Sequence, residues 1–230
     1  MKPLMKFLMQ SNMLKDRDNI VVGTVLFDRA KIYDSLLEFL DKNLKDFPAY
    51  KMDVDKTMNS EDLITQLLDT FLQEKNREAQ LPFIIKNQFK YNSGRRSSDI
   101  GILFLKFSKK DAFFVIEAKR LPTPGAGREK EYVEGNLGGI ERFKRAHHGN
   151  ELPIGGMIAY IQSDKPADCL LKVNSWIENL ITTNTDDTIS WNKEDLLVDL
   201  KSKGYSKYKS KNSRLEQLEI TLYHYWLTLN

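Results

Sequence analysis

Two apolar stretches, DIGILFLKF at residues 99–107 and DAFFVIEAKR at residues 111–120, decide the fold. Apolar side chains fall at both odd and even positions of each stretch. A strand formed by either one would therefore be buried on both faces. Only the three residues SKK separate them, which predicts a hairpin-like connection. Strands of this kind lie in the centre of a sheet that helices cover on both sides.

The segments around this pair predict alternating helices and strands. Residues 48–58 hold a proline and little periodicity, so we expect a connection there. The predicted helices span 28–47, 59–76, 129–149 (interrupted by glycines) and 167–181, and the further strands span 81–92, 153–163 and 215–229. This order predicts one mixed α/β domain over residues 1–230, with a central sheet flanked by helices.

Composition excludes several classes of protein. The chain has 230 residues, of which 41% are hydrophobic and 29% charged, and its net charge is +3. With Cys169 as the single cysteine, neither a disulfide framework nor a cysteine-ligated zinc or iron–sulfur cluster is expected. No apolar run is long enough to cross a bilayer and no secretion signal is evident, so we expect a cytoplasmic protein without a membrane partner.

Three charged residues interrupt the apolar pair of strands. Asp99 begins the first strand, and Glu117 and Lys119 stand near the end of the second. Because strand side chains alternate, Glu117 and Lys119 share a face. Asp99 shares that face only if it opposes one of them, which requires a turn centred on Ser108 or Lys109. A two-residue turn at 109–110 would instead oppose Asp99 to Arg120 and turn its carboxylate away.

Two carboxylates and an ammonium at the edge of an apolar sheet are costly without a partner, and a divalent cation supplies one. Oxygen ligands favour Mg²⁺, for which Mn²⁺ substitutes, and Mg²⁺ sites are often completed by water and substrate phosphate. Such an ion lowers the pKa of bound water, and Lys119 would orient that water or stabilise developing charge. The simpler alternative is an ion pair between Glu117 and Lys119 at the rim of the sheet.

Asp99 followed by Glu117-Ala118-Lys119, after a helix and a strand, resembles the PD-(D/E)XK superfamily of restriction-endonuclease-like nucleases. The resemblance covers residues 60–163 and implies an αβββαβ core, with residues 1–59 as a helical extension and 164–230 as a C-terminal extension. It implies DNA cleavage, with Asp99, Glu117 and the Ala118 carbonyl as metal ligands and Lys119 as the catalytic lysine. Ser98 stands where many members have proline. The surrounding stretches SEDLIT, GRRSSDIG, EYVEGNLGGIERF and GGMIAYIQ resemble bacterial defence-type members.

The resemblance also implies an acidic residue on the first core helix and basic or amide residues near the site. Glu61 matches the acidic position as a further catalytic residue and metal ligand, and Glu74 is the alternative. Gln88 and Arg142 are expected to bind nucleic acid. Arg95 and Arg96, which precede Asp99, are placed to meet a phosphate.

Other polar residues favour structural roles. Lys144 fits a solvated helix face, and His147 and His148 fit the C-terminal end of a helix, where they would interact with its dipole. His224 fits a packed position in an aromatic strand. The stretch KSKGYSKYKSKNSR at 201–214 is either a mobile lysine-rich loop or a phosphate-contacting surface.

These observations predict a metal-dependent nuclease that hydrolyses DNA phosphodiesters, specifically an endonuclease of bacterial defence or DNA processing. A homodimer fits this function because cutting both strands of a duplex requires two sites. The alternative is a catalytically inactive subunit with the same fold that binds DNA or another protein.

Overall fold

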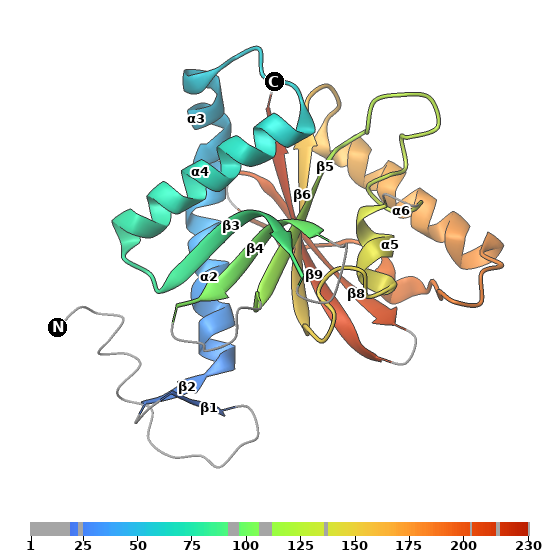
Figure 1. Ribbon diagram of the computed structural model, residues 1–230. Helices are drawn as coiled ribbons and strands as arrows, with labels where there is room; N and C mark the ends of the chain where they lie inside the picture. The colour runs from blue at the N-terminus through green and yellow to red at the C-terminus, as the bar shows by residue number, and fades with distance from the viewer. Residues whose placement is uncertain are drawn as a thin grey trace.

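The computed structural model describes residues 19–22, 25–91, 97–105, 112–135, 138–202, 204–214 and 217–229. There the chain forms an α/β fold with helices on both faces of a seven-stranded mixed sheet (Figure 1). The helices are α2 (Arg29–Asn43), α3 (Phe47–Val54), α4 (Glu61–Ala79), α5 (Gly139–Lys144) and α6 (Pro166–Thr183), with 3-10 turns η1 (Leu44–Asp46) and η2 (Lys193–Asp195).

The strands of the large sheet lie in the order β3-β4-β5-β6-β9-β8-β7. They are β3 (Phe83–Lys90), β4 (Ser97–Phe104), β5 (Phe114–Arg120), β6 (Ile154–Ile161), β7 (Val198–Asp199), β8 (Ser206–Arg214) and β9 (Gln217–Thr228). A separate hairpin pairs β1 (Asn19–Val22) with β2 (Val25–Asp28). Strands β5, β6 and β9 run parallel, and the other neighbours in the sheet are antiparallel. The C-terminal region therefore continues the central sheet, because β9 pairs directly with β6.

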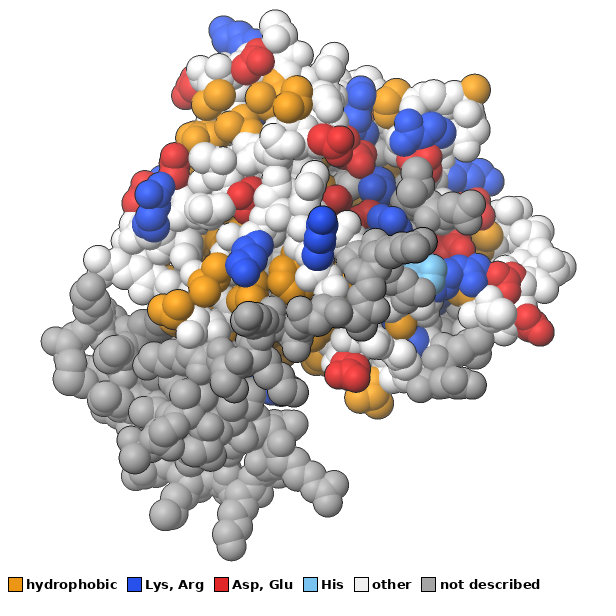
Figure 2. Space-filling view, in the orientation of Figure 1, with side chains coloured by type: hydrophobic (Ala, Val, Ile, Leu, Met, Phe, Trp, Pro, Cys, Tyr) orange, Lys and Arg blue, Asp and Glu red, His pale blue; other side chains and the backbone are white. Residues whose placement is uncertain are grey.

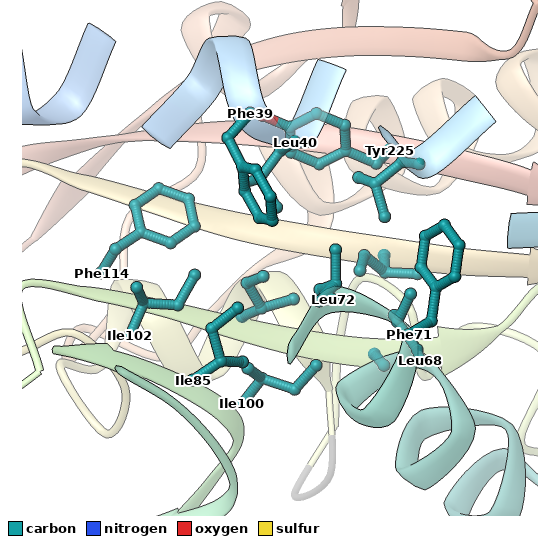
Figure 3. Packing of buried hydrophobic residues seen from close by; sticks show 14 of the residues in the cluster. Phe39, Leu40, Leu68, Phe71, Leu72, Ile85, Ile100, Ile102, Phe114 and Tyr225 are labelled. Atoms are coloured by element: carbon teal, nitrogen blue, oxygen red, sulfur yellow. The ribbon is translucent and has the colours of Figure 1, made fainter. Parts of the chain in front are cut away.

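Both faces of the central strands are buried, as the two apolar stretches predict. On one face Ile100, Ile102 and Phe114 pack with residues of α2 and α4, as Figure 3 shows. On the other face Leu103 and Val115 pack in a second cluster that includes residues of α5 and α6. Sequestering both apolar faces is the main favourable term that holds the layers together.

Helix α4 crosses one face of the sheet and brings its first residue to the C-terminal end of β5. Its buried residues include Ile64, Leu68 and Leu72, which recur at the spacing of one helical face. Glu61 and Asp62 occupy the first turn, where acidic side chains interact favourably with the positive end of the helix. The helix ends at Gln80, whose backbone is left-handed with φ of 53°.

Two predictions about secondary structure are wrong. Residues 48–58 are not all a connection, because α3 covers Phe47–Val54 and holds Pro48 in its first turn, where proline is tolerated. The helix expected over 129–149 is only α5, Gly139–Lys144, preceded by turns. At Gly138 a β-carbon would lie 2.3 Å from the backbone carbon of Glu134, so this tight turn requires glycine.

The basic stretch 201–214 was expected to be either a mobile lysine-rich loop or a phosphate-contacting surface, and the structure excludes the loop because β8 occupies most of it. The strand has few apolar residues, and its buried positions include Ser210 and Asn212. Pairing with β9 along most of its length satisfies its backbone. Lys207 packs over the ring of Tyr225 and lies 2.6 Å from Asp41, so part of the basic charge is already paired.

Candidate active site

Strand β5 carries two charged residues into an almost fully buried position. Glu117 is 1% exposed and Lys119 is 7% exposed, and both lie two residues apart on one face. The ammonium nitrogen Nζ of Lys119 lies 3.0 Å from Oε1 of Glu117. Residues of the parallel strand β6 flank them, with Met157 opposite Glu117 and Ala159 opposite Lys119. An ion pair with this little solvent needs several partners to be stable.

Asp99 joins this pair at the point where β4 and β5 separate. The register pairs Ile100 with Ile116, and its continuation by one residue opposes Asp99 to Glu117. Asp99 therefore shares the face of Glu117, as a turn centred on Ser108 predicts, although the turn itself lies outside the described residues. The carboxylate oxygen Oδ2 of Asp99 accepts a hydrogen bond of 2.7 Å from the backbone N–H of Ala118. The side chain thus takes the place of a backbone acceptor at this end of β4.

A backbone irregularity accompanies Asp99 on the neighbouring edge strand. Gln88 of β3 would oppose Asp99, yet the ladder passes from the pair Asn87–Ile100 directly to Phe89–Ser98. Gln88 has a left-handed φ of 48°, which is uncommon and costly for a residue other than glycine. Its side chain is exposed. The predicted nucleic-acid contact therefore lies on a strained segment of β3, at the register position opposite Asp99.

Glu61 closes the cluster from the start of α4. Its Oε1 lies 3.1 Å from Nζ of Lys119, and its Oε2 accepts a hydrogen bond of 2.8 Å from the backbone N–H of Arg120. Glu74, the alternative acidic residue of the same helix, instead accepts a hydrogen bond from the hydroxyl of Tyr50 at 3.3 Å. Of these two glutamates, Glu61 is therefore the one that reaches β5.

Two further groups contact Glu117 from α5 and the turn that follows it. Nη1 of Arg142 lies 2.9 Å from Oε1, and Nε2 of His148 lies 3.1 Å from Oε2. Interaction with the helix dipole, the role expected for His148, does not account for this position. Helix α5 ends at Lys144, and Ala146 and Gly149 have left-handed backbones with φ of 54° and 57°. These bends direct His148 toward β5, and a pair of adjacent histidines in the sequence gives no sign of them.

Burial and neighbouring charges shift the pKa values of Asp99 and Glu117 in opposite directions. Burial, and then the charge of Glu117, raise the pKa of Asp99 to about 7. Burial would also raise the pKa of Glu117, but His148, Lys119 and Arg142 outweigh it and lower this pKa to about 2. Burial opposes the charge of Lys119, but Glu117, Glu61 and Asp99 hold its pKa above the usual value. Glu117 is thus a carboxylate with several cationic partners, whereas Asp99 is held where its charge is poorly compensated.

The other residues singled out in the sequence have varied positions. Arg142 is partly exposed beside Glu117, whereas Arg95 and Arg96 lie outside the described residues. Lys144 is not on a solvated face: it is buried, pairs with Asp195 and packs over Trp191. His224 is fully buried as expected.

Figure 2 shows acidic and basic side chains gathered between the N-terminal end of α4 and α5, where this cluster lies. Comparison of the chain with protein-family models, with curated proteins and with solved structures gave no significant match. The geometry and chemistry of the cluster are therefore the basis for any functional proposal. Within the described ranges, no helix has the length and apolar character needed to span a membrane.

Proposed function

We propose that this chain is a metal-dependent nuclease that hydrolyses DNA phosphodiester bonds on a restriction-endonuclease-like core. One observation carries the proposal: Asp99, Glu117, Lys119 and Glu61, from two strands and a helix, form a single charged cluster at the end of buried strands. A rim ion pair alone would need neither Asp99 nor the N-terminal residue of α4. The chain order α4-β3-β4-β5-α5-β6 supports the same core.

The ligands fit a hard divalent cation that keeps several water molecules. Within the described residues no group of three His, Cys, Asp or Glu side chains is placed to hold a metal ion. The carboxylates of Asp99 and Glu117 with the carbonyl oxygen of Ala118 would hold Mg²⁺, for which Mn²⁺ substitutes. Water and phosphate would complete such a shell. The raised pKa of Asp99 supports this fit, because a cation would compensate the charge that burial disfavours.

The residues of the chain then have distinct tasks in hydrolysis. When bound, Mg²⁺ would supply a water of lowered pKa and neutralise charge on the phosphodiester. Lys119 remains an ammonium, because its acidic neighbours raise its pKa, so it donates hydrogen bonds to the attacking water or to a phosphate oxygen. Glu61 holds that ammonium in place through Oε1. Arg142 presents a partly exposed guanidinium, whose fork of donors suits phosphate.

The edge strand β3 offers a surface for the DNA backbone. Lys86, Gln88 and Lys90 are exposed, and the structure gives neither lysine an ion-pair partner among the described residues. Figure 2 shows Lys and Arg side chains over this part of the sheet, beside the charged cluster. Cations that neutralise phosphates bind DNA without reading its sequence, so these lysines would position the duplex.

Cleavage assays on supercoiled plasmid and single-stranded DNA test the proposal. The wild type with Mg²⁺ or Mn²⁺ is expected to cut, and Asp99→Asn and Lys119→Met to lose this activity. Lys172→Met is the matched control, because Lys172 pairs with Asp164 on the exposed side of α6. Equal cleavage by the wild type and both site variants would overturn the proposal.

A second candidate is an inactive nuclease-fold subunit that binds DNA or a protein partner. It is favoured by the fact that Glu117 already has Lys119, Arg142 and His148 within ion-pairing distance. A carboxylate compensated in this way does not require a metal ion. Calorimetric titration with Mn²⁺ separates the two candidates: the nuclease binds one ion per site, and the inactive subunit binds none while retaining salt-dependent DNA affinity. More specifically, we propose that the nuclease is an endonuclease that acts as a homodimer in bacterial defence or DNA processing.

A further inference from the structure

His148 and Glu117 form a contact that the proposed chemistry does not use. Both side chains are 1% exposed, and Nε2 of His148 lies 3.1 Å from Oε2 of Glu117. The two oxygens of this carboxylate have different surroundings. Oε1 lies near both Lys119 and Arg142, whereas among the described residues it is the imidazole of His148 that lies within ion-pairing distance of Oε2.

The imidazole ring of His148 is held by packing on two sides. The ring of Tyr91 stacks on it at 6.4 Å between centroids, and Phe143 meets it at 5.6 Å in an edge-on arrangement. The backbone is held as well, because the N–H of His148 donates to the carbonyl of Arg142, and the N–H of Gly149 donates to the hydroxyl of Tyr91. The ring therefore has a fixed orientation toward Glu117.

The contact also defines which ring nitrogen carries a proton. Nδ1 has no hydrogen-bond partner among the described residues, and Nε2 faces a carboxylate oxygen. A lone pair on Nε2 would repel that oxygen, so we assign the hydrogen to Nε2, the nitrogen nearer to Oε2. The two atoms lack the alignment of a good hydrogen bond, and such bonds in catalytic sites often align only when ligands bind.

We propose that His148 is a positioning residue that fixes the rotation of the Glu117 carboxylate through Nε2–H, and that its packing between two rings serves this purpose. The contact with Glu117 stands on geometry alone, whereas its consequence for metal binding rests on the proposed function. Outer groups that orient a ligating carboxylate typically change metal affinity about 10–100-fold when removed. The same contact with Oε2 leaves Oε1 with the cations from β5 and α5.

Two substitutions separate positioning from packing. His148→Phe keeps a ring between Tyr91 and Phe143 but removes the donor, whereas His148→Gln keeps a donor and loses the ring. We expect His148→Phe to weaken Mn²⁺ binding about tenfold or more and His148→Gln to stay within a few-fold of wild type. The opposite order, with His148→Phe equal to wild type and His148→Gln impaired, would identify a packing role and overturn the inference.

A double-mutant cycle distinguishes failure of this inference from failure of the nuclease proposal. Urea unfolding of the full chain is measured for wild type, His148→Phe, Glu117→Gln and the double variant, without metal. Direct contact predicts coupling of about tenfold in the unfolding equilibrium constant. A parallel cycle of His148→Phe with Asp164→Asn is expected to be additive, because Asp164 lies between β6 and α6 and pairs with Lys172, a partner that His148 does not share. Coupling without Mn²⁺ binding by wild type would retain the positioning contact and reject the metal site, whereas an additive cycle would reject the contact even in an active nuclease.

Discussion

Replacing Asp99 with asparagine is expected to change stability and metal binding in opposite directions. Asp99 is held at the end of β4 where burial, and then Glu117, raise the pKa of its carboxyl from 3.8 to about 7. An acid whose folded pKa is raised contributes stability below its unfolded pKa, and this contribution is lost as the pH rises through the folded pKa. At pH 9 the charged carboxylate therefore costs free energy in the folded protein, and the neutral amide removes that cost.

The size of the effect follows from the two pKa values. A rise from 3.8 to about 7 corresponds to about 4 kcal/mol of unfolding free energy between acidic and alkaline pH. We expect about 2 kcal/mol of stabilisation in Asp99→Asn at pH 9, because the group is partly exposed and solvent reduces the penalty. The amide oxygen can still accept the hydrogen bond from the N–H of Ala118. At pH 4 the two proteins should differ little.

Urea unfolding at pH 4, 6 and 9 in the presence of EDTA measures this difference. With Mn²⁺ present the order should reverse, since wild type binds the ion and is stabilised by mass action while Asp99→Asn is not. Asp164→Asn is the control, because its partly exposed carboxylate pairs with Lys172 and has a lowered pKa, so no stabilisation at pH 9 is expected. Asp99→Asn less stable than wild type at pH 9 without metal would refute the reasoning.

The remaining predictions concern the contact between Lys119 and Glu61, the buried His224 and the affinity for DNA. Lys119→Met should lower the cleavage rate about 10²–10³-fold. Glu61→Gln should lower it about tenfold, because Glu117 still holds the Lys119 ammonium, whereas Glu74→Gln should cleave like wild type. Equal losses in the two glutamate variants would contradict the assignment of Glu61. Burial lowers the pKa of His224 to about 3, so the stability it contributes is present above pH 6.5 and lost as the pH falls toward 3. In the Asp99→Asn background we expect a loss of about 2 kcal/mol of unfolding free energy between pH 7 and 5, and an NMR signal assigned to the His224 imidazole that titrates near 6.5 would exclude this. Each of Lys86→Ala and Lys90→Ala should reduce the slope of log affinity for DNA against log salt by about 1, whereas unchanged slopes would remove β3 from the DNA surface.

The sequence alone was sufficient for the centre of the fold and for the shared face of Glu117 and Lys119 on β5. Apolar residues fall at both odd and even positions of β4 and β5, for example Ile100, Ile102, Leu103 and Val115. This pattern is typical of strands buried on both faces, and the structure buries them in this way. The alternation of residues placed Glu117 and Lys119 together. The position of Asp99 depended on the register, so the sequence could state the condition but not its outcome.

Other features depend on tertiary contacts that no local pattern records. In β8 the inward positions include Ser210 and Asn212, so the strand lacks the apolar alternation that would predict it. Its pairing with β9 and the hydrogen bond between Ser210 and His224 hold it in the sheet instead. The choice between Glu61 and Glu74 required knowing which end of α4 meets β5. His148 reaches Glu117 through left-handed backbone turns at Ala146 and Gly149, of which only the glycine could be anticipated.

The position of a bound Mn²⁺ ion tests the central claim most directly. Anomalous diffraction from crystals of the full chain grown with MnCl₂ locates the ion without reference to activity. We predict one peak about 2.1 Å from carboxylate oxygens of both Asp99 and Glu117, with the Ala118 carbonyl completing the protein ligands. Crystals in which Mn²⁺ binds elsewhere, while Lys119, Arg142 and His148 remain the partners of Glu117 and Asp99 binds no ion, would contradict the account.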